Sequence, residues 1–337
     1  MKVFQIQGEW GIDHLQLAER PMPRPRPGQV LLRMRASSLN YRDLVVPERG
    51  YGNLTGTLPL IPISDGVGEV VEVGDDVSRV NVGDRVCPIF FQDWIAGAPD
   101  ATRLSCSLGG PLDGTMCEFM CLPEQGVVKV PDHLSDLEAA TLPCAALTAW
   151  SAIVTEGAVR PGDQVLIQGS GGVALFALAF AKQVGARVTV ISSSDDKIER
   201  LKALGADVTI NYRTTPEWYK PARETTGGRG FDQIIELGGE RTLPQSLRCI
   251  RPGGTLSMIG VLSGAQLSTS LGLIITRQVR LQGISVGNRD GFEAMLRAME
   301  QVRMPVVVDR VFAFEDLKDA LDYLRSGSQF GKICISH

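Results

Sequence analysis

The segment 164–192 constrains the fold of this chain more than any other part of its sequence. It contains a short apolar strand (164–168), a Gly-Ser-Gly-Gly turn, a helical stretch (173–186) and a second apolar strand (187–192). Two parallel strands need a crossover connection, and a helix of this length supplies one. Further strands of similar length are predicted at 207–212, 232–238, 254–260 and 279–285. This βαβ rhythm predicts a doubly wound parallel sheet of six strands.

The glycine turn matches the pattern G-x-G-x-x-G/A at Gly169, Gly171 and Ala174, with a strand before it and a helix after it. Gly-rich loops also occur as plain turns, but this context favours binding of a dinucleotide pyrophosphate. Small residues let the backbone approach the phosphates, and the helix N-terminus offers free N–H groups. The predicted cofactor-binding residues of the turn are Gly169, Ser170, Gly171, Gly172 and Val173.

The end of the second strand favours NADPH over NADH. An acidic residue at this position would bind the ribose 2′-OH of NAD and repel a 2′-phosphate, but the chain has Ser192 there. Neutral donors and a cation follow within reach, namely Ser193, Ser194 and Lys197. Ser194 also predicts the N-cap of a second helix at 195–204, which Gly205 ends.

Three nearby residues leave alternatives open. Asp195 and Asp196 can hold a 2′-OH, or they can be first-turn acids that the helix dipole favours. Tyr212 can lie beside a 2′-phosphate, or it can be a packing residue.

The two ends of the chain differ from its centre. Extended segments at 28–38, 65–74 and 83–90, separated by Gly, Pro and Asn, predict a β-rich N-terminal part. The C-terminal part has no fingerprint of its own and is expected to return and complete it. We therefore expect a first domain at 1–124, completed by 286–337, and a nucleotide-binding domain at 125–285.

Composition excludes several functional classes. The 337 residues suffice for about two domains. A net charge of −4 provides no positive field for nucleic-acid phosphates. No apolar run approaches the roughly 18 residues of a membrane span, and the N-terminal residues lack the apolar core of a signal peptide. Seven scattered cysteines favour reduced thiols. We expect a soluble, cytoplasmic protein with no nucleic-acid or membrane partner.

Several segments carry a resemblance to a known family: SSLNYRD (37–43), LPCAALTAWSAI (142–153), GSGGVA (169–174) and GKICI (331–335). With the β-rich N-terminal part, they make the chain resemble the medium-chain dehydrogenases/reductases over essentially its whole length. The closest resemblance is to zinc-independent, quinone oxidoreductase-like and enoyl reductase-like members. It implies an α/β protein with a GroES-like catalytic domain, a Rossmann domain and a cleft between them.

The resemblance also predicts that no zinc is bound. Positions that hold catalytic zinc in the related alcohol dehydrogenases correspond to Asn40, Asp65 and Cys144, and Asn is a poor zinc ligand. The loop that carries four structural cysteines in those enzymes contains only Cys106 here. Cys117 and Cys121 have metal-compatible spacing but no second pair beside them.

Without a metal, hydride transfer needs an acceptor that is already electrophilic, such as a quinone or a conjugated C=C bond. The resemblance suggests Asn40, Tyr41, Tyr51 and Asp65 as candidate catalytic residues. Asn40 would contribute an amide near the nicotinamide, and Tyr51 is the preferred proton donor, with Tyr41 as its competitor. The alternative for both tyrosines is an ordinary surface or cleft-lining role.

Further residues are expected to contact cofactor or substrate. Thr148 matches a threonine beside the nicotinamide, although a helical Thr often bonds its own preceding turn. Strand ends of the predicted sheet contribute Leu237, Gly238, Ile259, Gly260, Val261, Ile284, Ser285 and Val286. Tyr41, Phe90, Phe91 and Trp94 are candidate substrate contacts, with core packing as the alternative for the last three.

The expected function is an NADPH-dependent reductase of quinones or activated C=C bonds. The alternatives are a zinc-independent carbonyl reductase or alcohol dehydrogenase that acts on aldehydes, and an NADPH-binding protein without activity. Strand 279–285 is expected to lie at a sheet edge and to pair with a second copy, forming a homodimer.

Overall fold

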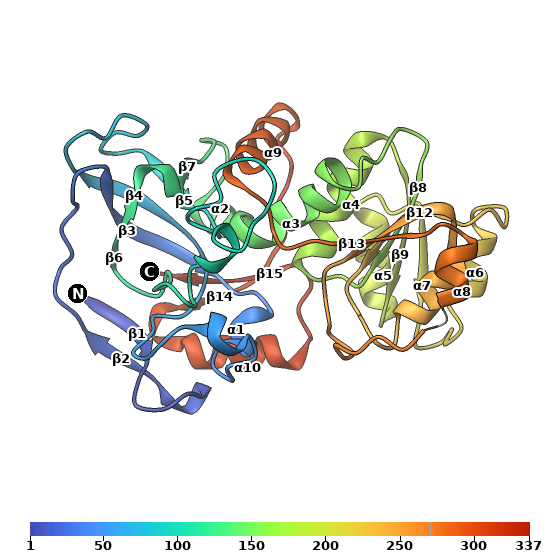
Figure 1. Ribbon diagram of the computed structural model, residues 1–337, viewed down its shortest axis with the longest axis horizontal. Coiled ribbons are helices and arrows are strands. Elements are labelled where there is room, and N and C mark those ends of the chain that lie inside the picture. The colour runs from blue at the N-terminus through green and yellow to red at the C-terminus, as the bar shows by residue number, and fades with distance from the viewer. Residues whose placement is uncertain (270) are drawn as a thin grey trace. The chain divides into compact units, whose positions relative to one another are not determined.

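The computed structural model describes residues 1–269 and 271–337, which form two compact units (Figure 1). Unit 1 comprises Met1–Leu147 and Val286–His337, and unit 2 comprises Thr148–Ser285. The first boundary therefore lies after residue 147, whereas the sequence suggested 124. The reason is that residues 127–129 pair with strand 85–88 of unit 1, so this segment belongs to the N-terminal sheet.

Unit 1 is built on a seven-stranded sheet with the order β14-β15-β3-β4-β5-β7, in which β6 also pairs with β3. A separate antiparallel pair consists of β1 and β2. The strand bounds are β1 Lys2–Ile6, β2 Leu15–Glu19, β3 Gln29–Ser38, β4 Asp65–Val73, β5 Arg85–Pro88, β6 Phe119–Pro123, β7 Val127–Lys129, β14 Val308–Ala313 and β15 Lys332–Ser336.

Short helices and two longer ones complete unit 1. The α-helices are α1 Arg42–Val45, α2 Asp136–Ala139, α9 Arg289–Val302 and α10 Leu317–Ser326, and Leu142–Ala146 forms a π-helix. In α10, Leu317, Leu321 and Leu324 are buried at spacings of three and four residues, so one face of the helix packs into the core of this unit.

The C-terminal strand lies among N-terminal strands in this sheet. Figure 1 shows β15 beside β3, although the two lie at opposite ends of the chain. β15 pairs in parallel with β14 and antiparallel with β3, where Cys334 faces Ser38. This return of the chain completes the sheet that carries the candidate site of unit 1.

Unit 2 confirms the predicted doubly wound sheet. Its six strands follow the order β10-β9-β8-β11-β12-β13, and all neighbours are parallel. The strand bounds are β8 Gln164–Gln168, β9 Arg187–Ser192, β10 Val208–Asn211, β11 Phe231–Glu236, β12 Ile250–Met258 and β13 Arg280–Gly283. The helices are α3 Leu147–Trp150, which begins at the boundary, a π-helix Ser151–Thr155, α4 Gly172–Val184, α5 Asp195–Ala203, α6 Tyr219–Glu224, α7 Leu243–Cys249 and α8 Leu271–Thr276.

The strand order reverses between β8 and β11. Successive strands add on one side of β8 up to β10, and then on its other side from β11 to β13. Open α/β sheets bind ligands at the carboxyl ends of the strands at such a reversal. The glycine turn after β8 and the loop after β11 both lie there.

Candidate functional site

The glycine turn has the geometry of a phosphate cradle. Gly169 has φ of +83°, and its N–H donates to the carbonyl of Ile191 at 2.7 Å, so the turn is tied to the neighbouring strand. Gly171 is the N-cap of α4 and has no side chain to cap the helix. A Cβ atom placed at either glycine would meet no atom within 4 Å. The open space and the N-terminus of α4 fit the pyrophosphate of a dinucleotide.

The residues predicted to select the cofactor gather where β9 and β10 end. Asn211 pairs with Ser192 in the sheet, and the Tyr212 N–H donates to the Ser192 carbonyl at 3.0 Å. Ser192 is buried, while Ser193 and Ser194 are half-buried. The exposed Arg213, which the sequence reasoning missed, follows Tyr212 and adds a cation to this region. The signal that could have pointed to Arg213 is its position directly after the predicted strand 207–212.

Ser194 and Asp195 are already engaged within this unit. The Ser194 hydroxyl accepts from the Lys197 N–H at 3.3 Å, which confirms the predicted N-cap of α5. The Asn211 side-chain amide donates to Asp195 at 2.8 Å. This contact directs the Asp195 carboxylate toward the end of β10.

A buried carboxylate organises the loop after β11. Glu236 is fully buried and accepts hydrogen bonds from Gln168 Nε2 (2.7 Å), Ser246 Oγ (2.5 Å), Thr242 Oγ1 and the N–H groups of Gly238 and Gly239. Gln168 Oε1 in turn accepts from the N–H groups of Leu237 and Gly238. The network links the ends of β8 and β11. Sequence reasoning missed both Glu236 and Gln168, although an acid shortly before Gly-Gly at a strand end was a usable signal.

The remaining strand-end residues lie around the same edge. The Ile259 and Gly260 N–H groups donate to the Glu236 carbonyl, and the Ile284 N–H donates to the Met258 carbonyl. Val261 is about half exposed. Ser285 is the last residue of unit 2, and Val286 is the first residue of the second part of unit 1. Thr148, which is not at a strand end, is buried in α3.

In unit 1, Asn40 lies in a hydrogen-bonded polar cluster. The buried Lys332 ammonium donates to Asn40 Oδ1 at 2.6 Å and to the Leu39 carbonyl. The Asn40 side-chain amide donates to Ser64 Oγ at 3.4 Å, and Ser64 Oγ donates to Asp65 Oδ1 at 2.7 Å. Two of the four candidate catalytic residues, Asn40 and Asp65, are thus joined in one cluster.

Two carboxyl groups in this region have raised pKa values. Asp65 is fully buried, and burial raises its pKa, although the nearby Lys332 partly opposes the effect. Burial likewise raises the pKa of Asp43 to about 7. Asp43 accepts from the Asn40 backbone N–H at 2.7 Å, so it holds the local backbone. Sequence reasoning did not identify Lys332, the cation of this cluster.

The two candidate tyrosines are both exposed, Tyr41 by 47% and Tyr51 by 45%. The Arg42 guanidinium lies 5.9 Å from the centre of the Tyr51 ring. Desolvation raises the pKa of Tyr51, and the Arg42 charge partly opposes it. Tyr51 is therefore a neutral phenol at pH 7, with a proton that it can donate.

The aromatic candidates for substrate contact pack on one another. Phe90 and Phe91 meet edge to face with ring centres 4.6 Å apart, and Phe91 and Trp94 lie 6.0 Å apart. All three are buried, and Arg42 covers the Phe90 ring at 4.8 Å. Such packing agrees with the alternative given above for Phe90, Phe91 and Trp94, in which they are core residues rather than substrate contacts.

The residues at the zinc-ligand positions do not fit a zinc ion. Asn40 Oδ1, the amide's acceptor atom, is taken by the Lys332 ammonium. The two Asp65 oxygens accept from Ser64 Oγ and from the Cys144 N–H at 3.0 Å. Burial raises the pKa of the Cys144 thiol, which disfavours the thiolate that zinc binds. Within residues 1–269 and 271–337, no group of three or more His, Cys, Asp or Glu side chains is placed to hold a metal ion.

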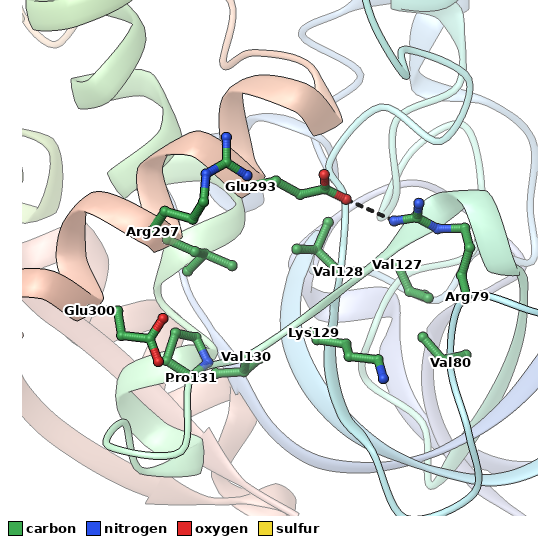
Figure 2. A pocket seen from close by; sticks show the side chains of 11 residues that line it. Arg79, Val80, Val127, Val128, Lys129, Val130, Pro131, Glu293, Arg297 and Glu300 are labelled. Atoms are coloured by element: carbon green, nitrogen blue, oxygen red, sulfur yellow. Dashed lines mark hydrogen bonds and ion pairs between the residues drawn. The ribbon is translucent and has the colours of Figure 1, made fainter.

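A separate cavity of about 400 Å³ lies in unit 1 between α9 and the segment 127–131 (Figure 2). Figure 2 shows Arg79 and Glu293 paired beside it. The two groups are 2.7 Å apart, and Lys129 pairs with Asp84 at 2.6 Å. None of its lining residues belongs to the predicted site.

Comparison with known proteins decides the family. Residues 26–132 match the alcohol dehydrogenase GroES-like domain, and residues 172–301 match the zinc-binding dehydrogenase family. A zinc-type alcohol dehydrogenase-like protein of Schizosaccharomyces pombe is 42% identical over 332 residues, which are 96% of each chain. The chain belongs to the medium-chain dehydrogenase/reductase superfamily. Its α/β fold class, a GroES-like unit and a Rossmann unit, is the one predicted, and the chain is an oxidoreductase that uses a nicotinamide cofactor.

Solved structures of this superfamily include close structural neighbours. A Sinorhizobium meliloti protein assigned as an alcohol dehydrogenase has a TM-score of 0.92 at 41% identity, covering all of this chain and 99% of the other. A mycobacterial protein complexed with NADPH has a TM-score of 0.84 at 25% identity, over all of both chains. The quinone oxidoreductase of Coxiella burnetii has a TM-score of 0.80 at 28% identity, over all of this chain and 99% of the other.

Among sequence relatives, the acryloyl-coenzyme A reductase of Sulfurisphaera tokodaii is 26% identical over 334 residues, which are 95% of this chain and 96% of the other. In the part of the chain that the structure describes, no helix is both long and apolar enough to cross a membrane.

Proposed function

We propose that this protein is an NADPH-dependent reductase that adds hydride to a quinone or to an activated C=C bond without zinc. The observation that carries the proposal is the Lys332–Asn40–Ser64–Asp65 cluster, because it uses the side-chain atoms that a zinc ion would need. Without a Lewis acid, the acceptor must be electrophilic by itself, as conjugated acceptors are. Relatives named as a quinone oxidoreductase and an acryloyl-coenzyme A reductase support this acceptor class.

In this proposal, bound NADPH supplies the hydride, and residues of unit 1 stabilise the charge that moves onto the acceptor. The Asn40 side-chain amide presents N–H groups, because its oxygen is occupied by Lys332. The Tyr51 phenol supplies the proton that completes the reduction, with Tyr41 as the alternative donor. Hydrogen-bond donors placed where charge develops are a large part of such catalysis.

The preference for NADPH rests on the ends of β9 and β10. Ser192 stands where a carboxylate would select NAD. Lys197, Tyr212 and the additional Arg213 provide the surroundings for a 2′-phosphate. The NADPH complex of the mycobacterial relative supports the same choice.

The test is NADPH oxidation, with NADH in parallel, against quinones, enones and aldehydes, in the presence and absence of a strong chelator. We expect chelator-insensitive turnover that prefers NADPH and is confined to quinones or enones. Chelator-sensitive turnover would contradict the metal-free proposal. A preference for NADH would contradict only the proposed preference for NADPH and would leave the metal-free proposal standing.

The second candidate is a zinc-independent carbonyl reductase or alcohol dehydrogenase. The names of the S. pombe and S. meliloti relatives favour its substrate class, alcohols and carbonyls, although the S. pombe protein is named as zinc-type. Chelator-insensitive turnover of aldehydes alone would establish it. Tight NADPH binding with no turnover would instead indicate the third alternative, a cofactor-binding protein without activity.

The proposal includes the remaining sequence predictions. Strand β13 is the last strand in the order of its sheet, and we propose that it pairs with a second copy to form a homodimer. The seven cysteines form no disulfide bond with one another, and we propose a cytoplasmic location on this ground.

A further inference from the structure

We propose that Lys332 is a positioning residue that fixes the side-chain amide of Asn40 in the orientation that catalysis needs. The proposal rests on the proposed function for the role of Asn40. It gives a role to Lys332, a residue of the GKICI segment to which neither the sequence analysis nor the comparisons assign one. It begins from the sheet register. Cys334 faces Ser38, and the Leu39 N–H donates to the Ile333 carbonyl, so β15 brings Lys332 opposite Asn40.

The contact determines which way the amide points. A lysine ammonium only donates hydrogen bonds, so the Asn40 atom 2.6 Å from it must be the carbonyl oxygen. The NH₂ end of the amide therefore faces away from Lys332, and one of its N–H groups approaches Ser64 Oγ at 3.4 Å. That is a long contact, so Lys332 is the stronger of the two partners.

Burial and charge explain why a lysine is kept here. Lys332 is 4% exposed, and a buried ammonium persists only when it is paired and hydrogen-bonded. Its bond to the Leu39 carbonyl anchors it to the end of β3, and the fully buried Asp65 supplies opposite charge nearby. The ammonium is therefore held between two structural anchors, which leaves the Asn40 amide little freedom to rotate.

A neutral residue of similar length at this position would remove the constraint. In Lys332→Met, Asn40 Oδ1 loses its donor, and the amide can turn to present either end. We expect kcat to fall about 10- to 100-fold, as misplaced catalytic groups do. In an Asn40→Ala background, the same Lys332→Met change should cost less than about threefold, because residues that act through one contact are not additive.

A spectroscopic test does not depend on enzyme activity. The chain has five asparagines, so ¹⁵N labelling of asparagine side chains gives five NH₂ signals, and Asn40→Asp identifies that of Asn40. We expect Lys332→Met to shift the Asn40 signal and to leave the other four unchanged. Lys129→Met, which removes an exposed lysine paired with Asp84 in the same unit, is the matched control and should shift no Asn40 signal.

Either of two results overturns the proposal. One is an unchanged Asn40 signal in Lys332→Met, and the other is an equal loss of kcat from Lys332→Met in the wild-type and Asn40→Ala backgrounds. If Lys332→Met does not fold, Lys332→Gln replaces it. The glutamine side chain is shorter than lysine and donates only an uncharged hydrogen bond, so the same shift of the Asn40 signal is expected. If the wild-type protein reduces no acceptor, the proposed function fails, while the NMR measurement still decides whether Lys332 orients Asn40.

Discussion

At the scale of single residues, different positions carry the two parts of the proposal, cofactor binding in unit 2 and metal-free chemistry in unit 1. Gly171 leaves open space beside the N-terminus of α4, and in our proposal a side chain there would enter the space of the pyrophosphate. Asn40 and Asp65, in contrast, already have hydrogen-bond partners. Substitutions at these positions therefore have distinct expected effects.

Gly171→Val should fold normally and bind NADPH poorly. The backbone of Gly171 is extended, with φ of −80°, and an added Cβ meets no neighbouring atom, so the substitution introduces no strain. Its branched side chain would occupy the phosphate space, and we expect at least about tenfold weaker binding, with Gly171→Ala intermediate. Titration of NADPH fluorescence measures this. Wild-type affinity in Gly171→Val would show that the phosphates bind elsewhere.

Tyr51→Phe should retain NADPH binding and lose turnover. Removal of the phenol removes the proposed proton donor, and kcat should fall about 100-fold or more. Tyr41→Phe is the matched control, since both tyrosines are about half exposed and lie near Arg42 in sequence. Steady-state kinetics with the best acceptor measures both variants. Loss in Tyr41→Phe alone would transfer the role to Tyr41.

At the scale of secondary-structure elements, local sequence patterns predicted the six strands of unit 2 and its helices α4 and α5, but not α6, α7 and α8. Strands 164–168 and 187–192 have the predicted bounds, because strand, turn and helix signals lie within a few residues of one another. The role of Lys332 could not be found this way. Its partner Asn40 is 292 residues distant, and the pairing of β15 with β3 depends on the whole sheet. Burial of Ser192 likewise follows from tertiary packing.

The ends of β9 and β10 provide a test of cofactor preference. Ser192→Asp places a carboxylate at the end of β9, where it repels a 2′-phosphate and accepts from a 2′-OH. The NADPH-to-NADH ratio of kcat/KM should fall about tenfold or more. Because Ser192 is buried, Ser193→Asp, half-buried beside it, is a useful second variant. An unchanged ratio in both variants would contradict the assignment of this region.

Helix α1 carries a pH-dependent contribution to stability. The pKa of Asp43 is raised to about 7 in the folded protein, while its ordinary value is 3.8. Between these pH values the folded protein binds a proton that the unfolded chain releases, so the free energy of unfolding falls as pH rises from about 4 to about 7. Between about pH 4 and about pH 7, the free energy of unfolding of the wild type should fall by on the order of 4 kcal/mol more than that of Asp43→Asn.

Denaturant unfolding of both proteins between pH 4 and pH 8 measures this difference. Asn at position 43 keeps an acceptor for the Asn40 N–H, so the variant should fold. A difference in stability that does not change with pH would show that Asp43 is ionised throughout.

At the scale of the whole molecule, the sequence predicted a discontinuous first domain, and the structure shows how both chain ends form one sheet. The boundary at residue 147 was not predicted, because the pairing of β7 with β5 joins segments that no local signal connects. Strand β13 leads to a prediction at this scale. Light scattering at micromolar concentration should give twice the chain mass of 36.4 kDa. A particle of one chain would contradict the homodimer.

The central claim is that hydride moves from NADPH to a conjugated acceptor without zinc. The most direct measurement mixes metal-depleted protein, its zinc content checked by mass spectrometry, with an enone and NADPH deuterated at nicotinamide C4. We predict deuterium on the β-carbon of the reduced C=C bond, at a rate that added zinc does not change. Deuterium on the carbonyl carbon, or turnover only after zinc is restored, would contradict the account.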